Sequence, residues 1–196
     1  MQEQYFIKPQ VDLLFFIWYK NNMREEFLDD SFFSPTKGNL SSDQVVEEIF
    51  GYIKEKPDMF YDIIVGCDSS SSDEPHFPVA VAILRKGEGG RFFLKKVKYS
   101  SSANKKFLNW KNRILEEVLL SCDLALFLRE EFRKNIEKLN NKNLRYQFRY
   151  IHADIGENGQ TRDMIKELTG LIIGNGFEPK IKPEAYVASV VADRYS

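Results

Sequence analysis

The chain has 196 residues, of which 43% are hydrophobic and 29% are charged, and its formal net charge is −1. This composition is typical of a globular domain, and it excludes a disordered chain and a generally basic nucleic-acid coat protein. The two cysteines, Cys67 and Cys122, are too few for a disulfide framework or a zinc ribbon. We therefore expect a cytoplasmic protein that meets any charged partner through a local patch.

The first 31 residues differ in pattern from the rest. The apolar run at 11–19 contains Asp12 and has about half the length of a membrane span. It also lacks the basic flank and cleavage site of a secretory signal, so neither a membrane anchor nor a leader is expected. Residues 1–31 are either a helical extension that packs on the domain or sequence upstream of a true start at Met23. The remainder, 32–196, is predicted to form one domain.

The first half of that domain predicts one helix and three strands. A turn is expected at 34–39, followed by a helix that Ser41 or Ser42 caps and that ends before Pro57. Short apolar runs bounded by turn residues then predict three strands, at 61–67, 77–85 and 91–98. The glycine-rich segment 87–90 joins the last two as a hairpin.

The second half alternates helices and strands. The expected elements are a long helix, a strand, a helix, a short strand and a final helix, at 105–139, 145–153, 161–173, 177–181 and 185–194. A three-strand meander followed by βαβ units predicts an α/β fold with a mixed five-stranded sheet and helices on both faces. In such sheets the functional site lies beyond the carboxyl ends of the strands.

Two acidic residues stand where that rule points. Asp68 follows the strand at 61–67, and Asp154 follows the strand at 145–153. If these strands are parallel neighbours, both carboxylates emerge at one edge, where they repel unless a proton or cation lies between them. Oxygen ligands of this kind suit Mg²⁺ or Mn²⁺. The alternative is that each aspartate only forms a turn at the end of its strand.

The helices offer further acids. On a wheel of the long helix, Glu117 lies on the flank of the apolar stripe, whereas Glu116 and Asp123 point away from it. Glu117 is therefore the acid directed toward the sheet, unless it extends its carboxylate to water. Asp193 shares a face of the last helix with Tyr186 and Val190, although a frayed terminal residue would also fit.

Several motifs, in this order, resemble the bacterial YkuK-like family of the ribonuclease H-like superfold. They are FSPTKGNL at 33–40, IVGCDS at 64–69, HADIGENG at 152–159, GNGF at 174–177, KIKP at 180–183 and ASVVAD at 188–193. The resemblance covers about five-sixths of the chain. It implies that Asp68, Glu117, Asp154 and Asp193 are a catalytic set that binds Mg²⁺ or Mn²⁺.

The resemblance also implies a function. Ribonuclease H-like enzymes hydrolyse phosphodiesters with two such ions. We therefore expect a metal-dependent nuclease acting on RNA, DNA or a hybrid, with the alternative of a non-catalytic nucleic-acid-binding or scaffold protein that retains the fold.

Other residues are candidates for contacts with a nucleic acid. Lys37, Lys180, Lys182 and Ser69 are the candidates for substrate binding, although a lone lysine is more often a solvated surface residue. His152 is either a proton shuttle or a packed structural histidine. A stretch at 91–113 has eight basic residues and no acid, with aromatic residues interleaved, as single-strand binding favours. The alternative is that those aromatic residues belong to the core.

Overall fold

The computed structural model describes residues 31–72, 75–99, 105–139 and 144–196. The two interpretations of residues 1–31 therefore concern a segment that lies almost wholly outside the described residues. The elements in the first half are β1 (Phe32–Ser34), β2 (Gly38–Leu40), α2 (Ser42–Glu55), β3 (Tyr61–Cys67), β4 (Phe77–Arg85) and β5 (Gly89–Val97). Those in the second half are η2 (Lys105–Leu108), α4 (Trp110–Leu139), β6 (Tyr146–Ala153), η3 (Arg162–Met164), α5 (Ile165–Gly174), β7 (Glu178–Lys180), η4 (Val187–Ala192) and η5 (Asp193–Tyr195).

The α/β fold with a mixed sheet is confirmed, but the sheet has seven strands rather than five. Its order is β2-β1-β5-β4-β3-β6-β7, with β3, β4 and β5 as the antiparallel meander and β6 and β7 added in parallel. The two extra strands, β1 and β2, flank the expected turn and meet in register from Phe32 opposite Leu40 to Ser34 opposite Gly38. Each has only three residues, which is too short for a period of two to show in the sequence.

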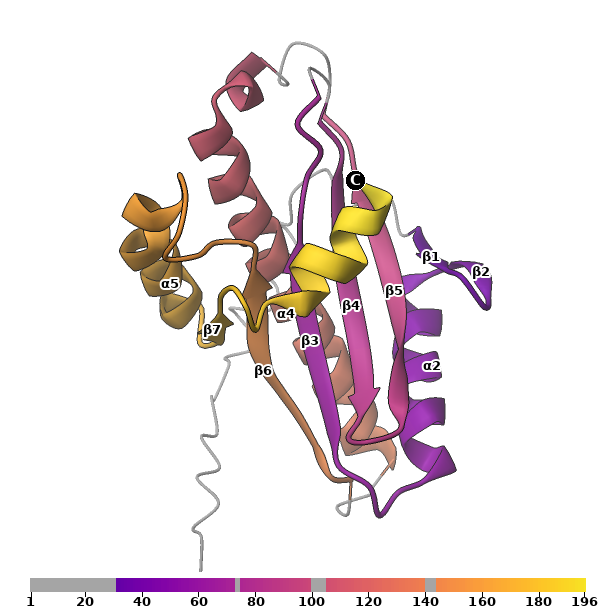
Figure 1. Cartoon of the computed structure of the whole chain (residues 1–196). Coiled ribbons are helices and arrows are strands. Elements are labelled where there is room, and N and C mark those ends of the chain that lie inside the picture. Colours follow the sequence, from indigo (N-terminus) through magenta and orange to yellow (C-terminus); the bar gives the residue numbers. More distant parts are fainter. Residues whose placement is uncertain (1–30, 73–74, 100–104, 140–143) are drawn as a thin grey trace, which may run out of the picture.

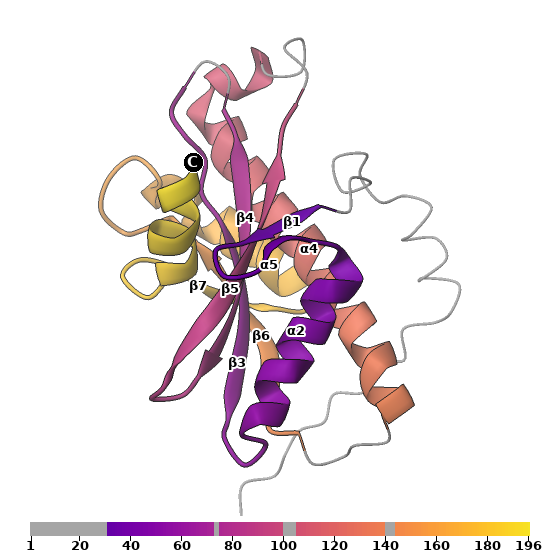
Figure 2. The same cartoon turned by 90° about the vertical axis from the view of Figure 1, so that its right-hand side faces the viewer.

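Helices cover both faces of the sheet, as expected. Helices α2, α4 and α5 pack on one face and enclose the main core, whereas the C-terminal segment η4–η5 lies on the other face (Figures 1 and 2). Side chains of β3 alternate between the two: Ile63 and Val65 join the main core, and Ile64 joins a smaller core with Val187 of η4. None of the helices in the described part of the chain has the length and apolarity that a membrane crossing requires.

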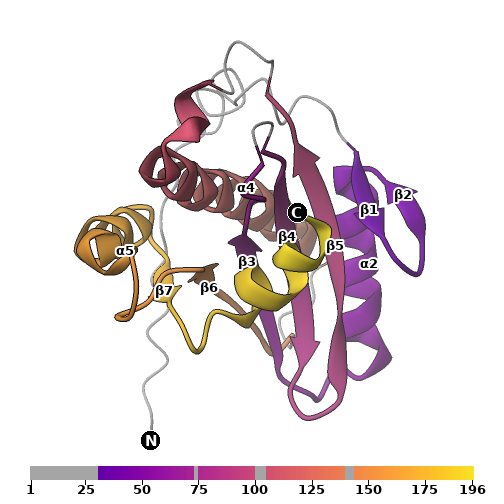
Figure 3. The ribbon, with the colours of Figure 1, turned by 45° about the horizontal axis from the view of Figure 1, so that its top comes forward.

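The C-terminal segment approaches the sheet closely at Gly66. Segment η4 contacts both β3 and β4 and runs over them (Figure 3). A Cβ atom on Gly66 would lie 2.9 Å from the backbone nitrogen of Ala188 and 3.0 Å from the carbonyl oxygen of His152. Both neighbours are backbone atoms, so they cannot move aside as a side chain can. The absence of a side chain at Gly66 thus lets η4 pack against β3.

We expect Gly66→Ala to destabilise the protein by about 1–3 kcal/mol, the usual cost of inserting a carbon into a close-packed region. Gly51→Ala is the matched control, because a Cβ at this position in α2 has no atom within 4 Å. That control should be neutral or stabilise by a few tenths of a kcal/mol, since alanine favours the helix. Urea unfolding of both variants measures the difference. Equal unfolding midpoints for Gly66→Ala and wild type would contradict the expectation.

Candidate functional site

Asp68 and Asp154 follow two neighbouring strands at the same level of the sheet. Strands β3 and β6 are parallel, and their last residues, Cys67 and Ala153, are paired. Each aspartate is the next residue along its strand, so the parallel pairing assumed from the sequence is confirmed. The carboxyl ends of β3 and β6 therefore bring both acids to one edge of the sheet.

Asp68 lies in a crowded negative environment. Burial raises its pKa from 3.8 to about 7, and the negative charges of Asp154 and Asp193 act in the same direction. The positive charge of Lys182 and a hydrogen bond from the Ser69 backbone oppose this rise. The charges of Asp154 and Asp193 thus act on Asp68 in addition to its burial, which is the larger cause of the rise. The structure therefore brings together three of the four predicted acids as electrostatic neighbours.

Glu117 is the fourth acid, and α4 directs it toward the sheet as the wheel predicted. Its side chain is buried, and its Oε1 accepts hydrogen bonds from the hydroxyl of Ser69 at 2.5 Å and from the Ser69 backbone N–H at 3.1 Å. Burial raises the pKa of Glu117 to about 8, and the charge of Asp68 contributes to the rise. Ser69, predicted to bind substrate, thus holds Glu117 beside the end of β3.

The two oxygens of Asp154 differ in their surroundings. Oδ2 lies 2.8 Å from the ammonium nitrogen of Lys182. Oδ1 is buried and has no hydrogen-bond partner. Asp154 also borders a narrow crevice that Glu117 and Cys67 line as well. An oxygen of this kind is costly to bury without a partner, so Asp154 has an unfilled capacity to bind a cation or a proton donor.

The remaining predicted position to describe, Asp193, lies at the start of η5 and is exposed. It approaches from the face of the sheet opposite to α4, because η4 runs over β3 and β4 before it. Across residues 31–72, 75–99, 105–139 and 144–196, no three Asp, Glu, His or Cys side chains lie close enough together to hold one metal ion. The charges of Asp154 and Asp193 act on Asp68, and that of Asp68 acts on Glu117, but the role of the four acids as metal ligands stays a prediction.

A further buried acid was placed wrongly from the sequence. Glu116 was expected to point away from the apolar stripe, but it is 6% exposed and accepts a hydrogen bond from the hydroxyl of Tyr99. Tyr99 and η2 cover the start of α4 on the side that a free helix would expose to water. Phe107 of η2 packs against Tyr99 and helps to cover α4 there. A helix wheel considers a single helix, so it cannot predict burial by residues from another segment.

The three predicted lysines are far from equivalent. Lys37 lies in the β1–β2 turn at the opposite edge of the sheet, where its ammonium is 3.0 Å from Glu48. Lys180 lies on β7, with its ammonium 2.6 Å from Glu184. Lys182 is the one of the three that contacts a predicted site acid. The structure therefore brings Lys182, and not Lys37, to the acids.

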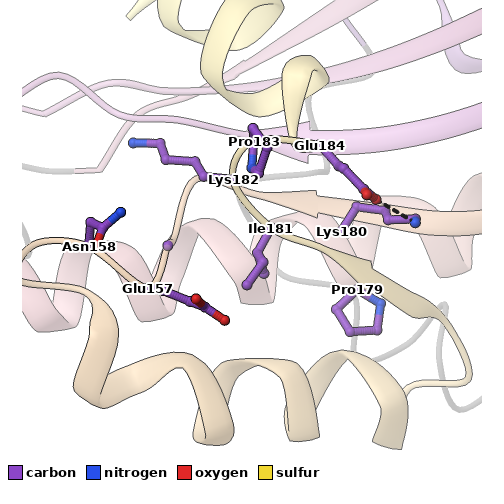
Figure 4. A pocket seen from close by; sticks show the side chains of 9 residues that line it. Glu157, Asn158, Pro179, Lys180, Ile181, Lys182, Pro183 and Glu184 are labelled. Atoms are coloured by element: carbon purple, nitrogen blue, oxygen red, sulfur yellow. Dashed lines mark hydrogen bonds and ion pairs between the residues drawn. The ribbon is translucent and has the colours of Figure 1, made fainter.

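An open pocket of about 700 Å³ adjoins this region. The segment that follows β6 and the segment that includes and follows β7 line it, with Glu157 and Asn158 from the first and Lys180, Lys182 and Glu184 from the second (Figure 4). Both charged and polar side chains border the pocket, and Lys182 joins it to Asp154. An extended polar ligand bound in this pocket would have one end near Lys182 and Asp154.

His152 is a structural histidine. It is 3% exposed, its Nδ1 accepts a hydrogen bond from the Val187 backbone at 3.1 Å, and Tyr186 packs edge-on at 4.7 Å. Burial lowers its pKa to about 4, and the charge of Lys180 adds to this effect. The ring is therefore neutral near pH 7, and it anchors the start of η4 to β6.

The basic stretch at 91–113 does not form one continuous binding surface in its described part. Arg91 is paired with Glu48 and Glu55 of α2, and Lys95 is 2% exposed. Phe93 and Phe107 are buried in the main core. The interpretation as core is thus confirmed for Phe93 and Phe107, which are unavailable for stacking on bases, whereas Phe92, Tyr99 and Trp110 are only partly buried against the core.

Comparisons with known proteins agree with this fold. A family model described as Ribonuclease H-like matches residues 44–196. The chain is also 26% identical to the uncharacterized protein YkuK of Bacillus subtilis (strain 168) over 181 residues, which cover 89% of this chain and 99% of YkuK. No solved structure gives a match. The motif resemblance to YkuK-like proteins is confirmed, and the chain belongs to the ribonuclease H-like family.

Proposed function

We propose that the protein is a divalent-metal-dependent nuclease whose ligands are Asp68, Glu117, Asp154 and Asp193. The observation that carries the proposal is the group of perturbed acids beside the carboxyl ends of β3 and β6. Asp68 and Glu117 have pKa values raised to about 7 and about 8, and Asp154 Oδ1 is buried without a partner. Perturbed acids that cluster in this way are typical of functional sites.

The residues fit Mg²⁺ or Mn²⁺. All four candidate ligands are carboxylates, the hard oxygen donors that these ions prefer. A bound divalent cation would supply activation of water and stabilisation of the leaving oxygen. Asp68 and Asp154 would hold it from adjacent strand ends, Ser69 would orient Glu117, and Asp193 would close the site from the opposite face of the sheet. Lys182 would contact a phosphate of the nucleic acid.

The first test is metal binding by calorimetry with Mn²⁺. Wild type is expected to bind Mn²⁺ at millimolar concentration or below, and Asp68→Asn is expected to bind it much more weakly. Failure of both proteins to bind, with and without an oligonucleotide, would exclude the proposal.

The second test is cleavage of labelled RNA, DNA and hybrid oligonucleotides. We expect Mn²⁺-dependent cleavage of at least one of them. Asp154→Asn should lower its rate by at least about 100-fold, because even the outer partners of metal ligands contribute 10- to 100-fold. Glu157→Gln is the control, since Glu157 lines the pocket without belonging to the predicted ligands. Equal rates for Asp154→Asn and wild type would contradict a catalytic role.

A non-catalytic nucleic-acid-binding protein is the second candidate. The ion pair between Lys182 and Asp154 favours it, because this pair partly neutralises the acids without a metal. This candidate predicts salt-dependent oligonucleotide binding that Asp68→Asn leaves unchanged, with no cleavage of any of the three substrates.

A further inference from the structure

Lys182 stands where a cation would bind Asp154. Its ammonium nitrogen is 2.8 Å from Oδ2, and the side chain is 52% exposed against 17% for Asp154. The ammonium therefore reaches inward from the surface to a largely covered carboxylate. One positive charge placed there satisfies Oδ2 and leaves Oδ1 without a partner. A divalent cation and the ammonium would thus compete for the same carboxylate.

The backbone holds Lys182 in this position. The N–H of Lys182 donates to the carbonyl oxygen of Ile155 at 2.8 Å, which ties the segment after β7 to the segment after β6. The next residue, Gly156, leaves room for the lysine stem: a Cβ atom there would lie 3.2 Å from Cβ of Lys182. The root of the side chain is thus fixed beside Asp154, whereas the long stem leaves the ammonium free to turn.

The ammonium of Lys182 has a second possible position, in the open pocket. Lys182 also lines the open pocket, and its side chain points away from that of Lys180, which is engaged with Glu184 (Figure 4). If the ammonium of Lys182 leaves Asp154, it does not pair with Glu184, because Glu184 is already paired with Lys180. It would then present a positive charge toward the pocket, where a phosphate is the complementary group.

We propose that Lys182 is a tethered counter-ion of Asp154 that a divalent cation displaces, and that the displaced ammonium then binds a phosphate of the nucleic acid in the pocket. This inference rests on the proposed metal site. It makes metal binding and nucleic-acid binding cooperative, because each leaves Lys182 in the position that the other requires.

The direct test is the affinity for Mn²⁺ alone, measured by calorimetry on the full chain. Lys182→Met removes the competitor, so we expect Mn²⁺ to bind about fivefold more tightly than in wild type, the factor that corresponds to an exposed ion pair. The Mn²⁺-induced rise in Tm should also be larger in this variant. Lys180→Met is the matched control: it makes the same change of charge two residues away, and its Mn²⁺ affinity should equal that of wild type.

Oligonucleotide binding tests the second half of the proposal. With Mn²⁺ present, a nuclease-resistant phosphorothioate oligonucleotide should bind wild type more tightly than Lys182→Met. The dependence of log K on log salt should be less steep in the variant by about 0.7, the value for one lost contact to a single strand. Without Mn²⁺, the two proteins should bind it equally, because Lys182 is then engaged with Asp154.

The outcomes separate this inference from the proposed function. If wild type binds Mn²⁺ and Lys182→Met binds it no more tightly, the inference is overturned and the proposed metal site stands. If neither wild type nor Lys182→Met binds Mn²⁺, both this inference and the proposed metal site are overturned. If both variants gain the same affinity, the effect is one of net charge, and Lys182 is not a specific competitor.

Discussion

Asp68→Asn is expected to stabilise the protein at pH 8 by up to about 4 kcal/mol when no divalent cation is added, since one pKa unit corresponds to 1.36 kcal/mol. The pKa of Asp68 is raised from 3.8 to about 7 by burial and by the charges of Asp154 and Asp193. Between about pH 4 and pH 7, the folded protein holds a proton that the unfolded chain has released. Stability must therefore fall as the pH rises through this range. Asparagine carries no charge, so the variant escapes this loss.

Urea unfolding at several pH values measures the effect. The free energies of unfolding of wild type and Asp68→Asn should be similar near pH 4 and diverge up to about pH 8. Millimolar Mn²⁺ should reduce or reverse the difference, because a cation stabilises the wild-type carboxylates and finds fewer ligands in the variant. Asp58→Asn, at an exposed position outside the cluster, should show no such divergence. A variant less stable than wild type at pH 8 would show that Asp68 is a structural residue instead.

Glu117→Gln should behave in the same way, because burial raises the pKa of Glu117 to about 8. The glutamine amide oxygen can still accept the two hydrogen bonds that Ser69 donates. The double variant with Asp68→Asn should gain less than the sum of the single gains, since each substitution removes part of the repulsion that the other relieves.

Arg85→Met is expected to lower the Tm by about 10 °C, a change typical of breaking a buried polar network in a protein of this size. Arg85 is 7% exposed and holds α2 to the sheet. Its guanidinium donates to the hydroxyl of Tyr61, to the carbonyl oxygen of Tyr52 and to Glu55, each at 3.0 Å, and lies 4.1 Å from the centre of the Tyr52 ring. Methionine keeps the apolar stem and loses all these contacts.

Two comparisons make this result specific. Arg85→Lys keeps the charge but not the planar fork of donors, so its Tm should lie between those of wild type and Arg85→Met. Arg145→Met makes the same charge change at an exposed position and should leave the Tm nearly unchanged. An unchanged Tm in Arg85→Met would show that the network contributes no net stability.

The same variant separates folding stability from the site. Arg85 pairs with Tyr61 at the start of β3, whereas Asp68 follows the end of that strand. The intervening residues span roughly 20 Å at the rise of a β-strand. Mn²⁺ affinity should therefore be the same in Arg85→Met and wild type, provided that it is measured well below the Tm.

The acids at the two strand ends illustrate what could be predicted. Asp68 and Asp154 were identified because a parallel sheet brings the carboxyl ends of its strands together, and the pairing of Cys67 with Ala153 confirms this arrangement. Glu117 was identified from the helical period, which places it toward the sheet. These features depend on local regularities, periods of two and of 3.6 residues, that every strand and helix obeys.

Glu116 and the strands β1 and β2 illustrate features that could not be predicted from the sequence. The burial of Glu116 depends on Tyr99, which another element brings over the start of α4. Likewise, β1 is placed in the sheet by its contact with β5, where Phe33 lies opposite Leu94. Contacts between residues far apart in the chain leave no periodic signal in either partner.

The sequence by itself determined the α/β class, the meander followed by parallel strands, the family and the placement of Asp68 and Asp154 at neighbouring strand ends. Only the tertiary structure decided the protonation and the interaction partners of these acids. It buried Asp68 and Glu117 enough to raise both pKa values, left Asp154 Oδ1 without a partner and placed the ammonium of Lys182 against Oδ2. The reason is physical: residue spacing fixes which face a side chain occupies, whereas its charge and partners depend on whatever the rest of the chain packs against it.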